Sequence, residues 1–168
     1  MPTIALMNGH AFAAGFMTAM MHDYRIMNPH RGFLCLNELD FGAPLKPPMA
    51  SIFRTKLPSP NTYRTMVLES KRFNALETLK EGIVDGLGGV DEVLAFVGEM
   101  GLAERGKSGV YGRLKAEMWR ETVAFLDNAE GSDRREEREL QDRNRRQEEE
   151  KRRVEAWERG GGRVLSKL

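Results

Sequence analysis

The stretch "IALMNGHAFAAGF", residues 4–16, decides the fold. An apolar run ends at Asn8 and Gly9, which predicts a short buried strand over residues 3–8 followed by a turn. The small residues Ala13, Ala14 and Gly15 then lead into a helix predicted over residues 14–22, apolar nearly all round. Small residues at such a turn let the backbone approach something closely, either a neighbouring element or a ligand.

Strand and helix patterns alternate along the next hundred residues and predict an α/β fold. Further strands are predicted over residues 24–27, 33–36 and 83–84, and helices over residues 48–53, 60–69, 75–81, 90–100 and 111–127. Ser59 caps the second of these helices, with Pro60 at its first position. Asn74 and Glu77 form the spacing of a capping box at the start of the third.

Composition excludes several classes of protein. Charged residues make up 30% of the 168 residues, yet the net charge is only +1, so no one-signed surface for nucleic acid is expected. The single cysteine, Cys35, rules out an intrachain disulfide and suits a reducing compartment. No apolar run is long enough to span a membrane, and no His, Cys, Asp or Glu cluster has metal-ligand spacing, so no metal is expected.

The chain changes character near residue 131. Residues 133–159 hold ten acidic and ten basic side chains, with few apolar ones. Acidic residues stand four positions before basic ones, a pattern typical of a solvated helix, as in Glu139 with Arg143, Glu148 with Arg152, Glu149 with Arg153 and Glu155 with Arg159. We therefore predict a main domain over residues 1–130, an exposed, partly helical linker over 131–163, and a short tail over 164–168; a partner-binding helix is the alternative for the linker.

The chain ends in Ser166, Lys167 and Leu168, the tripeptide that the peroxisomal import receptor reads. A run of glycines precedes it, at residues 160–162, and would leave it accessible. We expect a protein of the peroxisomal matrix, with the import receptor as a partner.

The turn at residues 13–15 suits a negatively charged oxygen. Where a turn opens a helix, unpaired backbone N–H groups point outward, and Gly and Ala leave room for a ligand carbonyl to reach them. This is the arrangement of an oxyanion hole. A tightly packed strand–helix corner would explain the same small residues.

Three separated segments carry a family resemblance. "IALMNGHAFAAGFMTAMMHDYRI", "RGFLCLNELDFGAPL" and "ALETLKEGIVDG" occur in this order and resemble the crotonase (enoyl-CoA hydratase/isomerase) superfamily, most closely its peroxisomal Δ3,Δ2-enoyl-CoA isomerases. The resemblance covers residues 2–127. It implies the C-terminal part of a crotonase-like ββα spiral fold, with the charged tail behind it.

The resemblance also implies roles for individual residues. Ala14 would supply a backbone N–H of the oxyanion hole, and Glu38 would be the catalytic glutamate, made basic by the apolar neighbours Leu36, Leu39 and Phe41. The substrate-binding residues would be Ala13, Gly15, Met17 and Phe41. Asp40 has a weaker claim than Glu38. The substrate would be an acyl-CoA, so that coenzyme A enters with the substrate and no separate cofactor is expected.

Met17 separates two activities within the family. Hydratases carry a second glutamate at this position, because adding water across a double bond needs two acid/base groups, whereas an isomerase needs one. Met17 therefore favours an isomerase of fatty-acid β-oxidation, with a hydratase as a second alternative.

Family members have a further N-terminal portion before the strand at residues 3–8, which contributes strands, coenzyme A contacts and the second oxyanion N–H. We expect this chain to lack that portion. The alternative function is therefore a catalytically silent subunit that assembles with full-length relatives, in a homo- or hetero-trimer as the family implies.

Overall fold

The computed structural model describes residues 1–160, apart from the side chains of residues 129, 132, 133 and 136. The tripeptide at residues 166–168 lies outside the described residues. The chain divides into two compact units, Met1–Asp127 and the residues from Asn128 onward. The first unit is a mixed α/β domain, as predicted.

Two small parallel sheets form the centre of the first unit. β1 (Ile4–Met7), β3 (Tyr24–Met27) and β5 (Gly86–Leu87) pair in the order β1-β3-β5, with Ile4 opposite Tyr24 and Met27 opposite Leu87. β2 (Ala11–Phe12) pairs with β4 (Leu34–Cys35). The strands predicted over residues 3–8, 24–27 and 33–36 are confirmed. The first and third are one residue shorter at each end, and the second has the predicted bounds.

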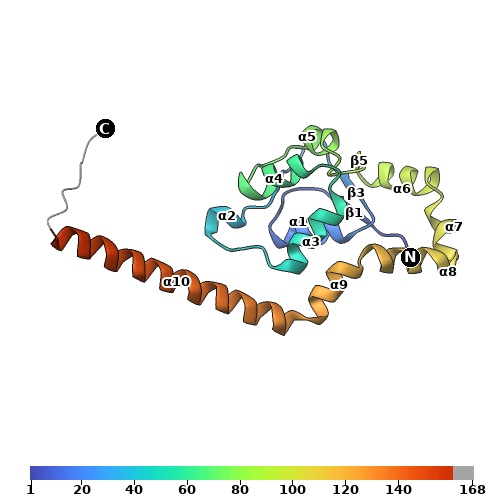
Figure 1. Cartoon of the computed structure of the whole chain (residues 1–168). Helices are drawn as coiled ribbons and strands as arrows, with labels where there is room; N and C mark the ends of the chain where they lie inside the picture. The colour runs from blue at the N-terminus through green and yellow to red at the C-terminus, as the bar shows by residue number, and fades with distance from the viewer. Residues whose placement is uncertain (161–168) are drawn as a thin grey trace. The chain divides into compact units, whose positions relative to one another are not determined.

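Helix α1 (Ala14–Met21) is the centre of the core. Phe16, Met17, Ala19 and Met20 are buried along it, because the helix contacts the strands β1 and β3 on one side and α3 (Pro47–Lys56) on another. Figure 1 shows α1 and α3 together beside these strands. The rings of Phe16 and Phe53 meet edge to face at 5.4 Å between centroids. The apolar pattern of residues 14–22 is therefore explained by burial on more than one side.

Three of the next helices follow their local signals, namely α4 (Pro60–Leu68), α5 (Ala75–Lys80) and α6 (Val90–Glu99). Two short helices, α2 (Glu38–Phe41) and α7 (Leu102–Lys107), complete this part of the unit. The Ser59 oxygen accepts the N–H of Asn61 at 3.2 Å, and Pro60 opens α4 as predicted. The short helices α2 and α7 carry no clear signal in the sequence.

The capping box of α5 gives a measurable contribution to stability. The N–H of Glu77 donates to Asn74 Oδ1 at 3.0 Å, and the N–H of Asn74 donates to Glu77 Oε2 at 3.0 Å. Asn74→Ala is expected to lower the free energy of unfolding by about 1 kcal/mol, because a helix N–H loses its acceptor. Urea unfolding followed by circular dichroism measures this. Asn74→Asp, which can accept the same bond, should stay within about 0.5 kcal/mol of wild type; an equal loss in both variants would contradict the capping role.

The strand predicted over residues 83–84 is wrong in its position. Ile83 and Val84 are buried, at 0% and 3% exposure, but their N–H groups both donate to the carbonyl of Thr78 in the turn that closes α5. The chain reaches β3 only at Asp85, whose N–H donates to Arg25 O at 2.8 Å. Burial without a strand partner therefore produced the apolar pattern.

The single helix predicted over residues 111–127 is also wrong. The structure has α8 (Gly109–Met118) and α9 (Arg120–Asp127), interrupted at Trp119. Trp119 packs against the core cluster, and α9 then runs along α3, where Ser51 and Thr122 share a hydrogen bond of 2.8 Å. Trp119, at this interruption, and Thr122, just after it, both lie toward the core.

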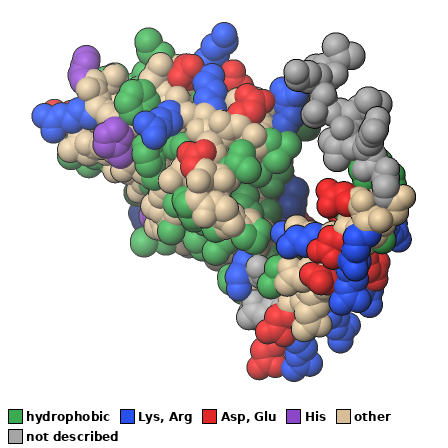
Figure 2. Space-filling view, turned by 90° about the vertical axis from the view of Figure 1, so that its left-hand side faces the viewer, with side chains coloured by type: hydrophobic (Ala, Val, Ile, Leu, Met, Phe, Trp, Pro, Cys, Tyr) green, Lys and Arg blue, Asp and Glu red, His purple; other side chains and the backbone are tan. Residues whose placement is uncertain are grey.

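The charged segment forms one helix, α10 (Ala129–Arg159), of 31 residues. Two of the predicted pairs are present, Glu148 with Arg152 at 3.6 Å and Glu155 with Arg159 at 3.2 Å, whereas Glu139 pairs with Arg135. Figure 2 shows acidic and basic side chains interspersed over this helix. None of the helices in residues 1–160 is long and apolar enough to cross a membrane.

Candidate active site

The turn before α1 is held against the strand that leads to Glu38. Ala11 pairs with Leu34 and Phe12 with Cys35, and the N–H of Ala13 then donates to the carbonyl of Cys35 at 3.0 Å. Because β2 and β4 are parallel, the residues that follow each strand emerge at the same end of the pair. Ala13 and Ala14, which follow β2, and Glu38, which follows β4, therefore lie beyond the same end of this pair.

Ala14 offers a backbone donor. It is the first residue of α1, and the first N–H groups of a helix have no acceptor within the helix. The helix dipole makes this end positive, and the first turn of α1 contains no acidic side chain that would neutralise it. An oxygen carrying negative charge is therefore favoured beside Ala14.

Ala13 holds an unusual backbone conformation, with φ 47° and ψ −123°. A side chain is strained there, and glycine is not. This strain sets the direction of the chain as it leaves β2 and enters α1. Sequence patterns cannot show it, because alanine, unlike glycine or asparagine, does not signal a positive φ.

Ala13→Gly is expected to raise the free energy of unfolding by about 1 kcal/mol, because release of the backbone strain exceeds the extra entropy of glycine in the unfolded chain. Thermal and urea unfolding measure the change. Ala14→Gly, one residue later and in the helix, should instead lower stability by up to about 1 kcal/mol. A loss of stability in Ala13→Gly would show that Ala13 is not strained.

Glu38 is a buried carboxyl group with an unsatisfied oxygen. It begins α2, is 8% exposed, and its Oε2 atom is buried without a hydrogen-bond partner among the described residues. Buried polar atoms are nearly always hydrogen-bonded, because an unpaired one costs free energy. An exception at the end of the β2–β4 pair is therefore a candidate for an acid/base group. Asn37 Oδ1, beside it, is buried and unpaired in the same way, a feature that the sequence reading missed.

The burial of Glu38 does not come from the neighbours that the sequence suggested. Leu36 is buried, at 1% exposure, but Leu39 and Phe41 are 56% and 58% exposed. The prediction that these two residues desolvate Glu38 is wrong, because α2 turns both side chains outward. Asp40 is exposed on the same helix, so it lacks the burial that distinguishes Glu38.

The remaining predicted site residues lie on both faces of α1. Met17 is 7% exposed and belongs to the core cluster, and its N–H donates to Ala13 O. A Cβ added at Gly15 would meet nothing within 4 Å. Gly15 instead lines an open groove along β1 and α1, together with Gly9, His10, Phe12 and Thr18. At Gly15, close packing of the corner therefore does not explain the small residue.

A glycine missed by the sequence reading makes the β2–β4 arrangement possible. Gly32 has a φ of 85°, and a side chain there would overlap the backbone of Gly9 and His10. The ring of His10 stacks on Phe33, and His10 Nδ1 accepts the Phe33 N–H at 3.2 Å. His10 is thus hydrogen-bonded within the turn, which gives it a structural role there.

Cys35 is unsuited to act as a nucleophile here. It is fully buried, and its Sγ donates to the carbonyl of Ser70 at 3.2 Å. Burial raises the pKa of its thiol, and the charges of Asp40 and Glu38 raise it further, against a smaller opposite effect of Arg72. The thiol stays protonated at neutral pH. Within residues 1–160, no group of three or more His, Cys, Asp or Glu side chains is arranged to hold a metal ion.

Comparison with known proteins places the chain in a family. The family model described as enoyl-CoA hydratase/isomerase matches residues 1–155. The chain belongs to this family. Relatives from Arabidopsis thaliana include enoyl-CoA delta isomerase 3, 33% identical over 76% of this chain, and the peroxisomal enoyl-CoA delta isomerase 1, 37% identical over 73% of it.

The family fold is also found by structural comparison. An enoyl-CoA hydratase from Mycobacterium ulcerans matches with a TM-score of 0.64 and 20% identity, over 78% of this chain and 59% of its own. A family protein from Pseudomonas syringae matches with a TM-score of 0.61 and 23% identity, over 76% of this chain and 55% of its own. The chain spans 56% and 53% of the two Arabidopsis relatives. The expected crotonase-like fold is thus confirmed for the part of the domain present.

Proposed function

We propose that this chain carries the C-terminal half of a Δ3,Δ2-enoyl-CoA isomerase centre, with Glu38 as its acid/base residue. The observation that carries the proposal is the buried, unpaired Glu38 Oε2, at the same end of the β2–β4 pair as the helix start at Ala14. A buried carboxylate with an unpaired oxygen is suited to take up a proton.

In the proposed reaction, the thioester oxygen of a 3-enoyl-CoA accepts a hydrogen bond from the N–H of Ala14. Glu38 removes a proton from the carbon next to the thioester carbonyl, and the electron pair shifts through the double bond to give a dienolate. Glu38 then returns the proton two carbons along the chain, which leaves the 2-enoyl-CoA. The N–H of Ala14 and the positive end of α1 stabilise the negative oxygen while it exists.

Met17 supports isomerisation over hydration. Its side chain is apolar and packs in the core cluster, so this position offers no second acid or base for water. The names of the Arabidopsis relatives agree with this choice. Hydration stays the alternative within the family, and the product formed from a 2-enoyl-CoA in water would distinguish the two.

We also propose the peroxisomal matrix as the compartment. Two relatives are named peroxisomal, and the sequence of this chain ends in Ser166, Lys167 and Leu168. Deleting these three residues from a fluorescently tagged chain, with the tag at the N-terminus, should abolish a punctate distribution if they act as an import signal.

A silent subunit is the second candidate function, favoured by a specific observation. Among the described residues, β1 pairs with a strand on one side only, namely β3. The proposed oxyanion hole has one donor in this part of the chain, the N–H of Ala14. A sheet edge is able to pair with another strand. Loss of one donor from an oxyanion hole costs about 2.7–4 kcal/mol in the barrier of a well-studied protease, so half a site is a weak catalyst.

The test is an isomerase assay of the purified chain with a 3-enoyl-CoA, followed by the ultraviolet absorbance of the conjugated product. The intact mass of the protein from its own cells is measured alongside. Turnover by the 19.0 kDa chain, or by a longer native form, supports the isomerase. A native mass of 19.0 kDa, no turnover and co-purification with a full-length relative would instead establish the silent subunit.

A further inference from the structure

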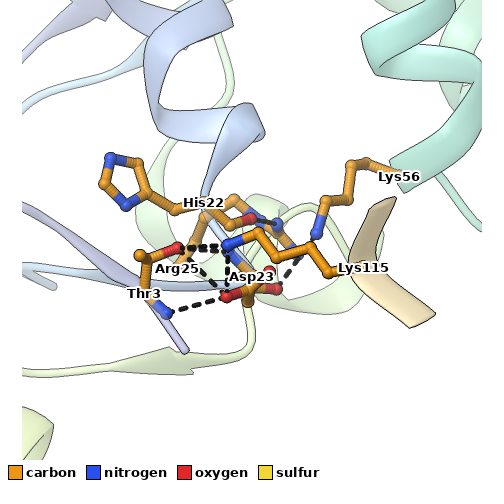
Figure 3. A network of polar contacts seen from close by, with 6 residues as sticks. All are labelled: Thr3, His22, Asp23, Arg25, Lys56 and Lys115. Carbon is orange, nitrogen blue, oxygen red and sulfur yellow. Dashed lines mark hydrogen bonds and ion pairs between the residues drawn. The ribbon is translucent and has the colours of Figure 1, made fainter. Parts of the chain in front are cut away.

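A second cluster of polar side chains lies at the other end of α1 from Ala14. Asp23 Oδ2 accepts hydrogen bonds from Thr3 N at 2.7 Å, from Thr3 Oγ1 at 3.1 Å and from Lys115 Nζ at 2.8 Å. Figure 3 shows Lys56 reaching this cluster from the end of α3. The cluster thus joins β1, β3, α3 and α8.

The two lysines of this cluster are in different electrostatic situations. Lys115 is ion-paired with Asp23, whose side chain is 7% exposed. Lys56 Nζ donates only to the backbone carbonyl of Asp23, at 3.2 Å, and lies 5.5 Å from the centre of the Trp119 ring. Among the residues whose side chains the structure describes, no carboxylate lies within ion-pair distance of Lys56 Nζ. Lys56 is therefore a half-buried amine without a counter-ion in contact.

Several charges act on Lys56 from the elements around it. Arg25 and Lys115 repel its ammonium form, while Asp23 and Asp85 attract it. Burial is the largest effect, and together these effects lower the pKa of Lys56 to about 8. An ordinary lysine, with a pKa near 10.4, is about 0.1% neutral at pH 7.5, whereas at a pKa of about 8 roughly a quarter is neutral.

An apolar crevice opens beside the amine. Its volume is about 260 Å³, and its walls are formed by Tyr24, Tyr111, Leu114 and Met118, with Asp23, Lys56 and Lys115 at its polar end. Burial, followed by the charge of Asp23, raises the pKa of Tyr111 to about 12, so this phenol stays neutral. The crevice accepts a short apolar chain next to a nucleophilic nitrogen.

We propose that Lys56 is a selective acylation site, at which a short-chain acyl thioester transfers its acyl group to Nζ while the chain lies against Leu114 and Met118. The neutral amine attacks the thioester carbonyl carbon and forms the N–C bond. The C–S bond breaks, the thiolate leaves, and it takes up the proton that the nitrogen loses. The product is a neutral amide at the end of α3, and no oxidant or further reactant is needed.

This site is independent of the isomerase centre. It requires only that the protein meets acyl thioesters, so a failure of Glu38 as a base would leave it standing. Acylation removes one positive charge from the cluster, where Arg25 and Lys115 already lie close together.

The test is incubation of the purified full chain with butyryl-CoA at pH 7.5, followed by mass spectrometry of each lysine over time. Lys56 is expected to react at least about tenfold faster than Lys115 in the same cluster and than Lys151 on α10. About a quarter of Lys56 is neutral at pH 7.5, whereas Lys115 is ion-paired with Asp23 and Lys151 does not line the crevice. Equal rates at the three lysines would overturn the proposal.

A pair of variants tests whether the acyl chain binds in the crevice. Leu114→Ala shortens the crevice wall and should slow butyrylation of Lys56 two- to fivefold with less effect on acetylation, whereas Leu94→Ala should change neither. Leu94 is a matched control for Leu114, because their side chains are 64% and 66% exposed on helices of the same unit. If Leu114→Ala left the ratio of the butyrylation rate to the acetylation rate at Lys56 unchanged, the role of the crevice would be overturned. Lys56→Arg should abolish the modified peptide while retaining the circular dichroism spectrum.

Discussion

Glu38→Gln is expected to lower kcat for isomerisation by about 10² to 10⁴-fold, because an amide cannot accept the proton that the reaction moves. The assay uses the preparation that isomerises 3-enoyl-CoA, and KM should change little, since the side chain acts on the proton and not on the coenzyme. The same substitution should raise the free energy of unfolding by about 1 kcal/mol, because it removes a buried carboxyl group whose Oε2 has no partner. The stability gain can be measured by urea unfolding without any turnover.

Asp40→Asn is the matched control for Glu38→Gln. It lies on the same short helix, but it is exposed, so its replacement should leave both kcat and stability nearly unchanged. Full activity in Glu38→Gln would exclude Glu38 as the base. Loss of activity in Asp40→Asn with full activity in Glu38→Gln would move the role to Asp40.

Asp85→Ala is expected to lower the free energy of unfolding by about 3 kcal/mol, because it leaves the buried cation of Arg25 without its ion-pair partner. Arg25 is 4% exposed; its NH2 atom lies 3.0 Å from Asp85 Oδ2, which also accepts the backbone N–H of Arg25 at 2.8 Å. Burial lowers the pKa of Arg25, even though Asp85 and Asp23 act to raise it. The cation is thus costly to bury, and its carboxylate partner offsets much of that cost.

Two comparisons isolate this effect. In the double variant Arg25→Met, Asp85→Ala the loss should be smaller than the sum of the single losses, since neither charge then remains buried alone. Glu121→Ala breaks the pair with Arg54 at 3.4 Å, where both side chains are about half exposed, and should change stability by less than about 1 kcal/mol. A loss in Asp85→Ala no larger than in Glu121→Ala would show that burial of Arg25 is not costly.

The sequence by itself determined the features that depend on neighbouring residues. The strands at residues 4–7 and 24–27 were predicted from short apolar runs. The spacing of Asn74 and Glu77 predicted the start of α5, because the two groups of a capping box lie three residues apart. The alternation of acidic and basic residues predicted a solvated, partly helical segment over residues 131–163, since pairs four residues apart meet on one helix face, and α10 covers Ala129–Arg159. The sequence motifs also predicted the family, the α/β class and Glu38 as the candidate base.

Only the tertiary structure decided the features that join distant residues. Glu38 is buried although Leu39 and Phe41 point outward, and Ala13 is held at a positive φ by a bond to Cys35, 22 positions later. Lys56 and Lys115 differ in their electrostatic surroundings, because Lys115 pairs with the carboxylate of Asp23 whereas Lys56 donates to its backbone carbonyl. Desolvation, backbone strain and ion pairing depend on atoms that the fold brings together, so no local pattern in the chain records them.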